Sequence, residues 1–266
     1  MPTQEDKLAV KMLVRARDDY QSMRKRMDNR LGRKADGTAQ EITERAFRTE
    51  DALMFQALAD NAREQERQVE KQLLSVLKRF PVYTAYLVHV KGVGPIAAGW
   101  IVGEFDIEKA TTVSKLWQFA GLNPGMVVGQ KRVEDGPDKW HFERTDTLVR
   151  GDKLTPEFVS PFHQRLRTAL VGVMADGFIK CQNAYALDYY YPYKARLEQE
   201  ENRIYGEEKA WKEVSKARRD RAAKRYMLKM FLKDLYVAWR TLEGLPMRPP
   251  YYDEYVRAPE LASHRA

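Results

Sequence analysis

Cysteine and long apolar runs are both scarce in this 266-residue chain, and each shortage excludes a class of protein. The single cysteine, Cys181, rules out an internal disulfide framework and a zinc site built from cysteines. No run approaches the roughly 18 apolar residues of a membrane span, so we expect no transmembrane helix. The opening residues MPTQEDKLAVKM lack the apolar core of a secretory signal. We therefore expect a cytoplasmic protein without a membrane partner.

Positive charge, in contrast, is in excess. The chain carries 46 Lys and Arg against 38 Asp and Glu, a formal net charge of +8. Such a balance favours a polyanionic partner such as nucleic acid. An apolar fraction of 44% in a chain of this length is enough for a real hydrophobic core in one or two domains. We expect a mainly α protein with no cofactor.

Residues 1–80 are expected to form a helical assembly arm. Thr3 and Asp6 have the spacing of a capping box before a helix over 3–31, and Thr38 with Glu41 repeats it before a second helix. No Gly or Pro occurs between Thr38 and Arg79, and a helix of about 40 residues would be roughly 60 Å long. Its apolar residues follow a loose heptad spacing. We therefore predict a helical hairpin or an intermolecular coiled coil, and a homo-oligomer held together through residues 3–79.

The segment Lys91-Gly92-Val93-Gly94 is the centre of a predicted helix–hairpin–helix, at the start of a domain over 81–243. Both glycines permit backbone angles that other residues avoid, and the following proline suits the first turn of a helix. Backbone N–H groups at such a helix N-terminus bind anions, so a nucleic-acid phosphate is the expected ligand, with Lys91 adding charge. The alternative is a plain corner between helices that carries no ligand.

Between Gly125 and Arg150 the pattern changes from helix to strand. Apolar runs flank an Asp-Gly-Pro turn, which predicts a β-hairpin or an irregular β-like loop. Beside His141, this segment contains the carboxylates Glu134, Asp135, Asp138, Glu143 and Asp146. A metal site or acid–base chemistry is a minor alternative, because turn formation explains the acids and nothing supplies a nucleophile. We assign no catalytic residue and no metal ligand.

Helix is expected again over residues 156–201, where five tyrosines (Tyr185, Tyr189, Tyr190, Tyr191 and Tyr193) lie beside Lys194 and Arg196. Aromatic side chains among cations can stack on bases, but core packing is the favoured interpretation. A short helix before this region, Thr112 to Ala120, is expected to end at Gly121 as a C-cap.

The last predicted helix runs from about Glu207 to Glu243. Its second half has an apolar stripe that must pack on the core. Its first half is basic and contains Lys216, Arg218, Arg219, Arg221, Lys224 and Arg225 against the single Asp220. Residues 218, 221, 225 and 229 share one face, where like charges repel unless a phosphate backbone or another anion neutralises them. A merely solvated helix is the alternative. The Pro-rich tail over 244–266 is expected to be extended.

A set of residues in the middle of the chain resembles a known family. They are Gly92, Gly94, Pro95, Ala97, Ala98, Glu104, Ser114, Leu116, Phe119, Ala120, Gly121, Leu122 and Pro124, followed by Arg150-Gly151-Asp152 and the helix RYMLKMFLKDLYVAWR from Arg225. Their order is similar to that of the C-terminal domain of the IS-110/IS-116 family of insertion-sequence transposases, over about residues 80–243. The resemblance implies a helix–hairpin–helix domain, a preceding coiled coil that mediates assembly, and relatives that bind guide RNA.

The chain also departs from that family. The family's RuvC-like nuclease domain has no counterpart among the opening helices, and Val128 stands where we would align the nucleophilic serine. A valine cannot attack a phosphodiester. We therefore expect a non-catalytic, transposase-derived nucleic-acid-binding protein, with DNA and RNA both open. Its phosphate contacts would be Lys91, Gly92, Val93, Gly94, Arg218, Arg219, Arg221, Lys224 and Arg225. The alternatives are a recombinase or nuclease subunit that needs a partner nuclease, and a purely structural assembly protein.

Overall fold

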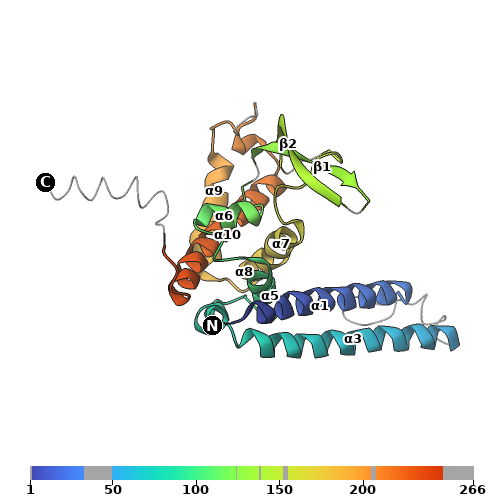
Figure 1. The fold of residues 1–266 in the computed structure, drawn as a ribbon. Coiled ribbons are helices and arrows are strands. Elements are labelled where there is room, and N and C mark those ends of the chain that lie inside the picture. The colour runs from blue at the N-terminus through green and yellow to red at the C-terminus, as the bar shows by residue number, and fades with distance from the viewer. Residues whose placement is uncertain are drawn as a thin grey trace. The chain divides into compact units, whose positions relative to one another are not determined.

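The computed structural model describes residues 2–32, 50–123, 125–137, 139–151, 155–204 and 208–247, and over them the chain is mainly helical with one two-stranded antiparallel β-ribbon (Figure 1). The mainly α class and the small β-hairpin are as expected from the sequence. The chain divides into two units, one of residues 1–85 and 94–104 and the other of residues 86–93 and 105–266. This division differs from the predicted boundary at residue 80.

The first unit contains α1 (Gln4–Arg30), α3 (Glu50–Leu77), α4 (Pro81–Ala85) and α5 (Pro95–Glu104). The predicted capping box begins α1: the Asp6 N–H donates to Thr3 Oγ1 at 3.1 Å, and the Thr3 N–H donates to Asp6 Oδ2 at 2.9 Å. The second predicted capping box, Thr38 with Glu41, lies outside the described residues.

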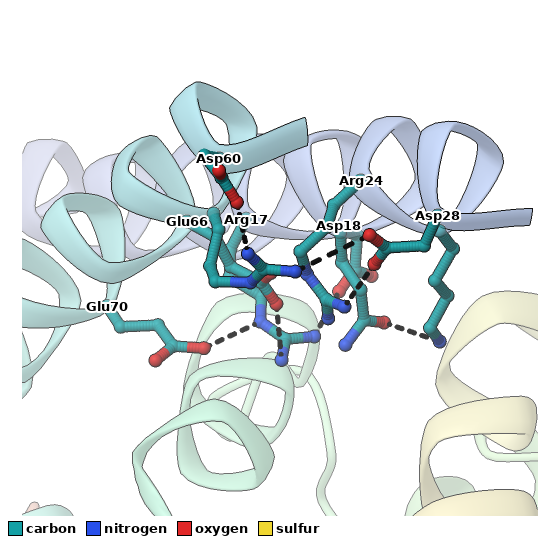
Figure 2. A network of polar contacts seen from close by, with 10 residues as sticks. Arg17, Asp18, Arg24, Asp28, Asp60, Glu66 and Glu70 are labelled. Carbon is teal, nitrogen blue, oxygen red and sulfur yellow. Dashed lines mark hydrogen bonds and ion pairs between the residues drawn. The ribbon is translucent and has the colours of Figure 1, made fainter. Parts of the chain in front are cut away.

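Ion pairs join α1 and α3 in an antiparallel arrangement. Asp6, at the start of α1, pairs with Arg79 just after α3, at 2.8 Å. Towards the other end of α1, Arg24 Nε lies 2.8 Å from Glu66 Oε2, and Arg17 Nη2 lies 3.0 Å from Glu66 Oε1 (Figure 2). Glu66 is buried, so its two arginines offset the cost of removing its charge from water. The pattern is consistent with two helices that pack within one chain.

Helix α5 completes the core of this first unit. A Cβ on Gly99 would lie 2.5 Å from a Val14 methyl, and one on Gly103 would lie 3.2 Å from the Lys11 Cα, so α5 packs closely on α1 at these glycines. The buried Glu104 pairs with Lys11 at 2.9 Å. The small residues after Pro95 therefore allow close packing on α1 and α3.

The second unit is built around α10. Its elements in chain order are η1 (Leu87–His89), α6 (Val113–Phe119), β1 (Met126–Gly136), β2 (Lys139–Arg150), α7 (Gln164–Arg167), the π-helix η2 (Thr168–Met174), α8 (Ala175–Lys180), the π-helix η3 (Ala186–Tyr190), α9 (Tyr191–Gln199), η4 (Trp211–Glu213) and α10 (Lys216–Leu242). The apolar stripe predicted for the last helix is buried at Leu228, Phe231, Leu232, Leu235 and Trp239. Gly121 ends α6 as predicted, with a φ of 65° and the Leu122 N–H donating to the Trp117 carbonyl at 2.9 Å.

Two helix starts differ from the sequence-based expectation. The helix expected from Pro156 begins at Gln164, where His163 Nδ1 accepts the Leu166 N–H at 3.0 Å as the N-cap. Pro161 explains the delay, because proline disfavours helical geometry in the residue before it. The helix expected from Glu207 begins at Lys216, after the short turn η4, with Ser215 as its N-cap. Most of the Pro-rich tail, residues 248–266, lies outside the described part of the chain.

Candidate functional site

The turn at Lys91 and Gly92 is fixed by contacts within the second unit. Gly92 has a φ of 91°, and a Cβ there would lie 3.0 Å from both Cys181 Sγ and Phe178 Cδ1. Glycine is therefore needed at this position for its backbone conformation and for space. The Lys91 carbonyl accepts a hydrogen bond from the buried Asn183 side chain. The Lys91 side chain is exposed.

The remaining two residues of the predicted phosphate site behave differently. The Val93 N–H donates to the Val90 carbonyl at 3.0 Å and its side chain is buried, so the prediction that this amide is available to phosphate needs correction. Gly94 does not have a positive φ, and a Cβ there would meet no atom of the described residues within 4 Å, so the expectation of unusual backbone angles holds only for Gly92. Lys91, Gly92 and Val93 belong to the second unit, whereas Gly94 belongs to the first.

The first turn of α10 is positively charged, which is unfavourable at a helix N-terminus. Ser215 Oγ accepts the Arg218 N–H at 3.3 Å, which makes Lys216 the first helical residue. Lys216, Arg218 and Arg219 therefore lie in the first turn, which has no acidic residue. The helix dipole favours negative charge at this end. An anion bound nearby would relieve the mismatch.

Two of the predicted phosphate contacts on α10 are instead engaged within the fold. Arg219 Nη1 donates to the Val214 carbonyl at 2.5 Å and the Lys212 carbonyl at 3.2 Å, and so fastens the η4 turn to α10. Lys224 Nζ lies 2.7 Å from Asp176 Oδ1 and 3.1 Å from Asp220 Oδ2. Burial lowers the pKa of Lys224, but these two carboxylates outweigh burial and leave the pKa above its ordinary value.

Arg218, Arg221, Arg225 and Lys229 form a row on α10, which we call the cationic stripe. Their spacing of three and four residues puts them on one helix face. Arg221 is exposed, and the Arg218 guanidinium lies 5.9 Å from the centre of the Trp211 ring. At the other end, Lys229 Nζ lies 5.5 Å from the centre of the Trp117 ring, whose Nε1 donates to the Lys229 carbonyl at 3.0 Å. A tryptophan therefore borders each end of the stripe.

The lowered pKa of Lys229 indicates that its surroundings are buried and positively charged. Burial lowers its pKa, and the neighbouring positive charge of Arg225 lowers it further. Over the described residues, no carboxylate lies within ion-pair distance of Lys229 Nζ. A half-buried lysine without a carboxylate, beside another cation, is stabilised by any anion that approaches it. The stripe is thus suited to a polyanion.

The carboxylates of the ribbon do not gather into a site. His141 Nδ1 lies 2.5 Å from Asp135 Oδ2, and both side chains are exposed. Glu143 stands opposite Lys131 in the strand register, and Asp138 lies outside the described residues. In the described ranges, no group of three His, Cys, Asp or Glu side chains could hold a metal ion.

The tyrosine-rich segment takes part in packing and in partly buried hydrogen bonds. Tyr185 donates its hydroxyl to Asp234 Oδ2 at 2.9 Å, and Tyr86 Oη lies 3.0 Å from Tyr185 Oη. Tyr190 donates to Asp220, the same carboxylate that Lys224 contacts. These contacts agree with the core interpretation for Tyr185 and Tyr190, whereas Tyr191 is 44% exposed. The sequence carries no signal that Asp176 pairs with Lys224, because the two residues lie in helices that are far apart along the chain.

Comparisons of the chain with family models, with curated proteins and with solved structures gave no match. The likeness to the transposase C-terminal domain therefore stays a sequence-based expectation. Among the helices that the structure describes, none combines the length and apolar character needed to cross a bilayer.

Proposed function

We propose that this chain is a non-catalytic nucleic-acid-binding protein, and that the cationic stripe of α10 contacts the phosphate backbone. The observation that carries the proposal is the environment of Lys229, where burial and the charge of Arg225 both disfavour the ammonium form and no carboxylate among the described residues compensates. A phosphate would supply the missing negative charge. The acid-free first turn of α10 supports the same ligand at the other end of the stripe.

The stripe is long enough for several phosphates. Residues 218 to 229 span about 16 Å of helix at roughly 1.5 Å per residue. One strand of a duplex advances about 3.4 Å per nucleotide, so the stripe can follow about five nucleotides of one strand. Contacts of this kind position a protein without reading bases, and we therefore propose binding that is largely independent of sequence. Lys91 and the Gly92 amide would add a smaller contact in the same unit.

A salt series tests this proposal directly. Fluorescence anisotropy of labelled duplex DNA, single-stranded DNA and structured RNA would be measured with the wild-type chain and with an Arg218→Glu/Arg221→Glu variant. Each lost phosphate contact lowers the slope of log K against log salt by about one, so we expect a slope lower by about two in the variant.

A control separates local contact from overall charge. Lys25→Glu/Lys71→Glu changes the net charge by the same amount on exposed positions of α1 and α3. We expect the control to keep the wild-type slope. Equal losses in both variants, or no binding by the wild-type chain to any of the three nucleic acids, would contradict the proposal.

A structural assembly role is the second candidate, and exposed apolar side chains on the first unit favour it. Leu8, Met12 and Met23 on α1 are exposed, at spacings that bring them near one helix face. We propose that copies of the chain associate through residues 3–79 at this face, in a helical hairpin or coiled-coil arrangement. Light scattering across a concentration series tests it, with Leu8→Gln/Met12→Gln expected to lower the molar mass. A wild-type chain that stays monomeric would exclude it.

A further inference from the structure

One face of the β-ribbon is left uncovered by the described residues of its unit. The strand register pairs Val128 with Leu148, Gln130 with Arg144, Arg132 with Phe142, and Glu134 with Trp140. Directly opposed residues share a face of a sheet, and so do residues two apart along a strand. We call the face formed by these eight residues the outer face of the ribbon, which Figure 1 shows as the pair β1 and β2.

Four large apolar side chains lie exposed on this outer face. Val128, Trp140, Phe142 and Leu148 are between 48% and 60% exposed. A ribbon of only two strands is marginally stable in water unless something packs on it. Exposed apolar side chains that gather on one face mark a binding surface.

The opposite, inner face is partly covered by the segment that follows β2, because a Cβ on Gly129 would lie 2.5 Å from Phe158 Cε1. The Val159 N–H donates to the Gln130 carbonyl at 2.8 Å, and Lys131 Nζ lies 2.7 Å from Glu157 Oε2. Glu143 shares this inner face, since it stands opposite Lys131. By the same two-residue spacing, the outer face has Arg132 and Arg144 together with Glu134 and the exposed Asp146, which lies between Arg144 and Leu148 on β2. The outer face therefore carries two cations and two anions, and its exposed apolar and aromatic side chains are what distinguish it.

Arginine and aromatic rings are in contact on the half of the outer face that lies next to the hairpin turn. The Arg132 guanidinium carbon lies 4.8 Å from the centre of the Trp140 ring. The Trp140 and Phe142 rings are 4.9 Å apart and inclined at 57°. Guanidinium groups and aromatic rings placed side by side suit a ligand that offers flat rings and negative charge together. Unpaired nucleotides have that chemistry, because bases stack on aromatic side chains while phosphates bind arginine.

We propose that the outer face of the ribbon binds unpaired nucleotides, with Trp140 and Phe142 stacking on bases and Arg132 and Arg144 contacting phosphates. The site is separate from the cationic stripe, and its assignment rests on the proposed nucleic-acid function. Single-stranded nucleic acid is the partner, because the faces of paired bases are covered by their neighbours in a duplex.

Substitutions that separate stacking from apolar contact test the proposal. Anisotropy would be measured with a labelled single-stranded oligonucleotide and with a duplex of equal length. A Trp140→Leu/Phe142→Leu variant keeps apolar bulk but removes the rings, and we expect its affinity for the single strand to fall about tenfold or more. Trp140→Phe keeps a ring and is expected to stay within about threefold of wild type. His141→Leu on the inner face is the matched control, and circular dichroism would confirm that each variant folds.

The outcomes separate this proposal from the one on α10. Loss of single-strand affinity in the double leucine variant, with duplex affinity unchanged, supports the ribbon site even if Arg218→Glu/Arg221→Glu has no effect. Loss in the stripe variant alone leaves the proposed function standing and overturns the ribbon site. No binding by the wild-type chain overturns both. If the leucine variant keeps its affinity but changes its molar mass in light scattering, the outer face is a protein contact and the proposal is wrong.

Discussion

The ammonium group of Lys224 lies 2.7 Å from the carboxylate of Asp176, which joins the most basic segment of α10 to α8. Lys224 also reaches Asp220, one helical turn before it. Lys224, which the sequence-based prediction groups with the phosphate contacts, therefore forms ion pairs that stabilise the fold. We propose that the basic half of α10 has two sets of cations, one that stabilises the fold and one that contacts phosphate.

Lys224→Met should lower stability and leave binding almost intact. The substitution removes both ion pairs of a side chain that is mostly buried, at a cost of about 1 to 2 kcal/mol. Urea unfolding would measure this loss, and anisotropy should show an unchanged salt slope. Arg221→Ala is the matched variant, expected to unfold like wild type and to lose about one unit of slope. The reverse pattern would mean that the two roles are assigned to the wrong residues.

Lys229→Met should have opposite effects on stability and on binding. The lowered pKa of Lys229 shows that burial and Arg225 disfavour its charge, so an apolar side chain of similar length relieves a cost of folding. We expect equal or higher stability in urea, together with weaker binding to nucleic acid. A gain of stability with a loss of function is typical of binding sites. Lower stability with unchanged binding would identify Lys229 as a core residue.

Serine substitutions at Gly92 and Gly94 should differ sharply. Serine at position 92 would need a φ near 91° and would press on Cys181 and Phe178, so we expect a loss of at least about 1 kcal/mol. At position 94 there is open space, and the Gly94 carbonyl accepts the first helical bond of α5, from the Ala98 N–H at 3.0 Å. Serine is a preferred residue at such an N-cap. Thermal unfolding should therefore show Gly94→Ser to be as stable as wild type or more so.

The tyrosine pair Tyr86 and Tyr185 should make the protein sensitive to alkali. Burial raises the pKa of both hydroxyls above their usual value near 10, and the Asp234 carboxylate adds to the shift. Above about pH 10 the unfolded tyrosines lose their protons while the folded ones keep them, so stability falls by about 1.4 kcal/mol per pH unit for each. Urea unfolding from pH 7 to 11 would show the decline. Tyr185→Phe should be less stable at pH 7 and should decline less steeply above pH 10; an unchanged slope would contradict this assignment.

Glu66→Ala should destabilise the first unit far more than Glu64→Ala. Glu66 is buried and pairs with Arg17 and Arg24. Removing it leaves these largely buried arginines with less buried partners such as Glu70 and Asp28, a loss of about 3 kcal/mol (Figure 2). Glu64 lies 3.8 Å from Arg67 on an exposed surface, where a pair contributes at most about 1 kcal/mol. Hydrogen exchange across α1 and α3 would localise the difference. Similar losses for both variants would show that the buried network is not what holds the helices together.

The features that the sequence predicts well are those set by near neighbours. Thr3 with Asp6 and Gly121 after α6 act within one helical turn, so their spacing alone is informative. Contacts between distant segments leave no such pattern. Nothing near Lys224 indicates Asp176, and nothing near Gly99 indicates that α5 packs on Val14. For the same reason the sequence groups Arg219 and Lys224 with the other cations of α10, although both are engaged within the fold.

The place of α5 in the first unit has a consequence for synthesis of the protein. On the ribosome, α1 and α3 are complete once residue 77 has been added, but Glu104 and the helix that packs on Val14 follow about 27 residues later. Until then Lys11 and Arg15 lack the carboxylate that they share in the finished chain. A fragment that ends at residue 80 would lack α5, and the apolar surface of α1 and α3 on which α5 packs would stay exposed. A fragment that ends after residue 104 is the shortest one that can close this core.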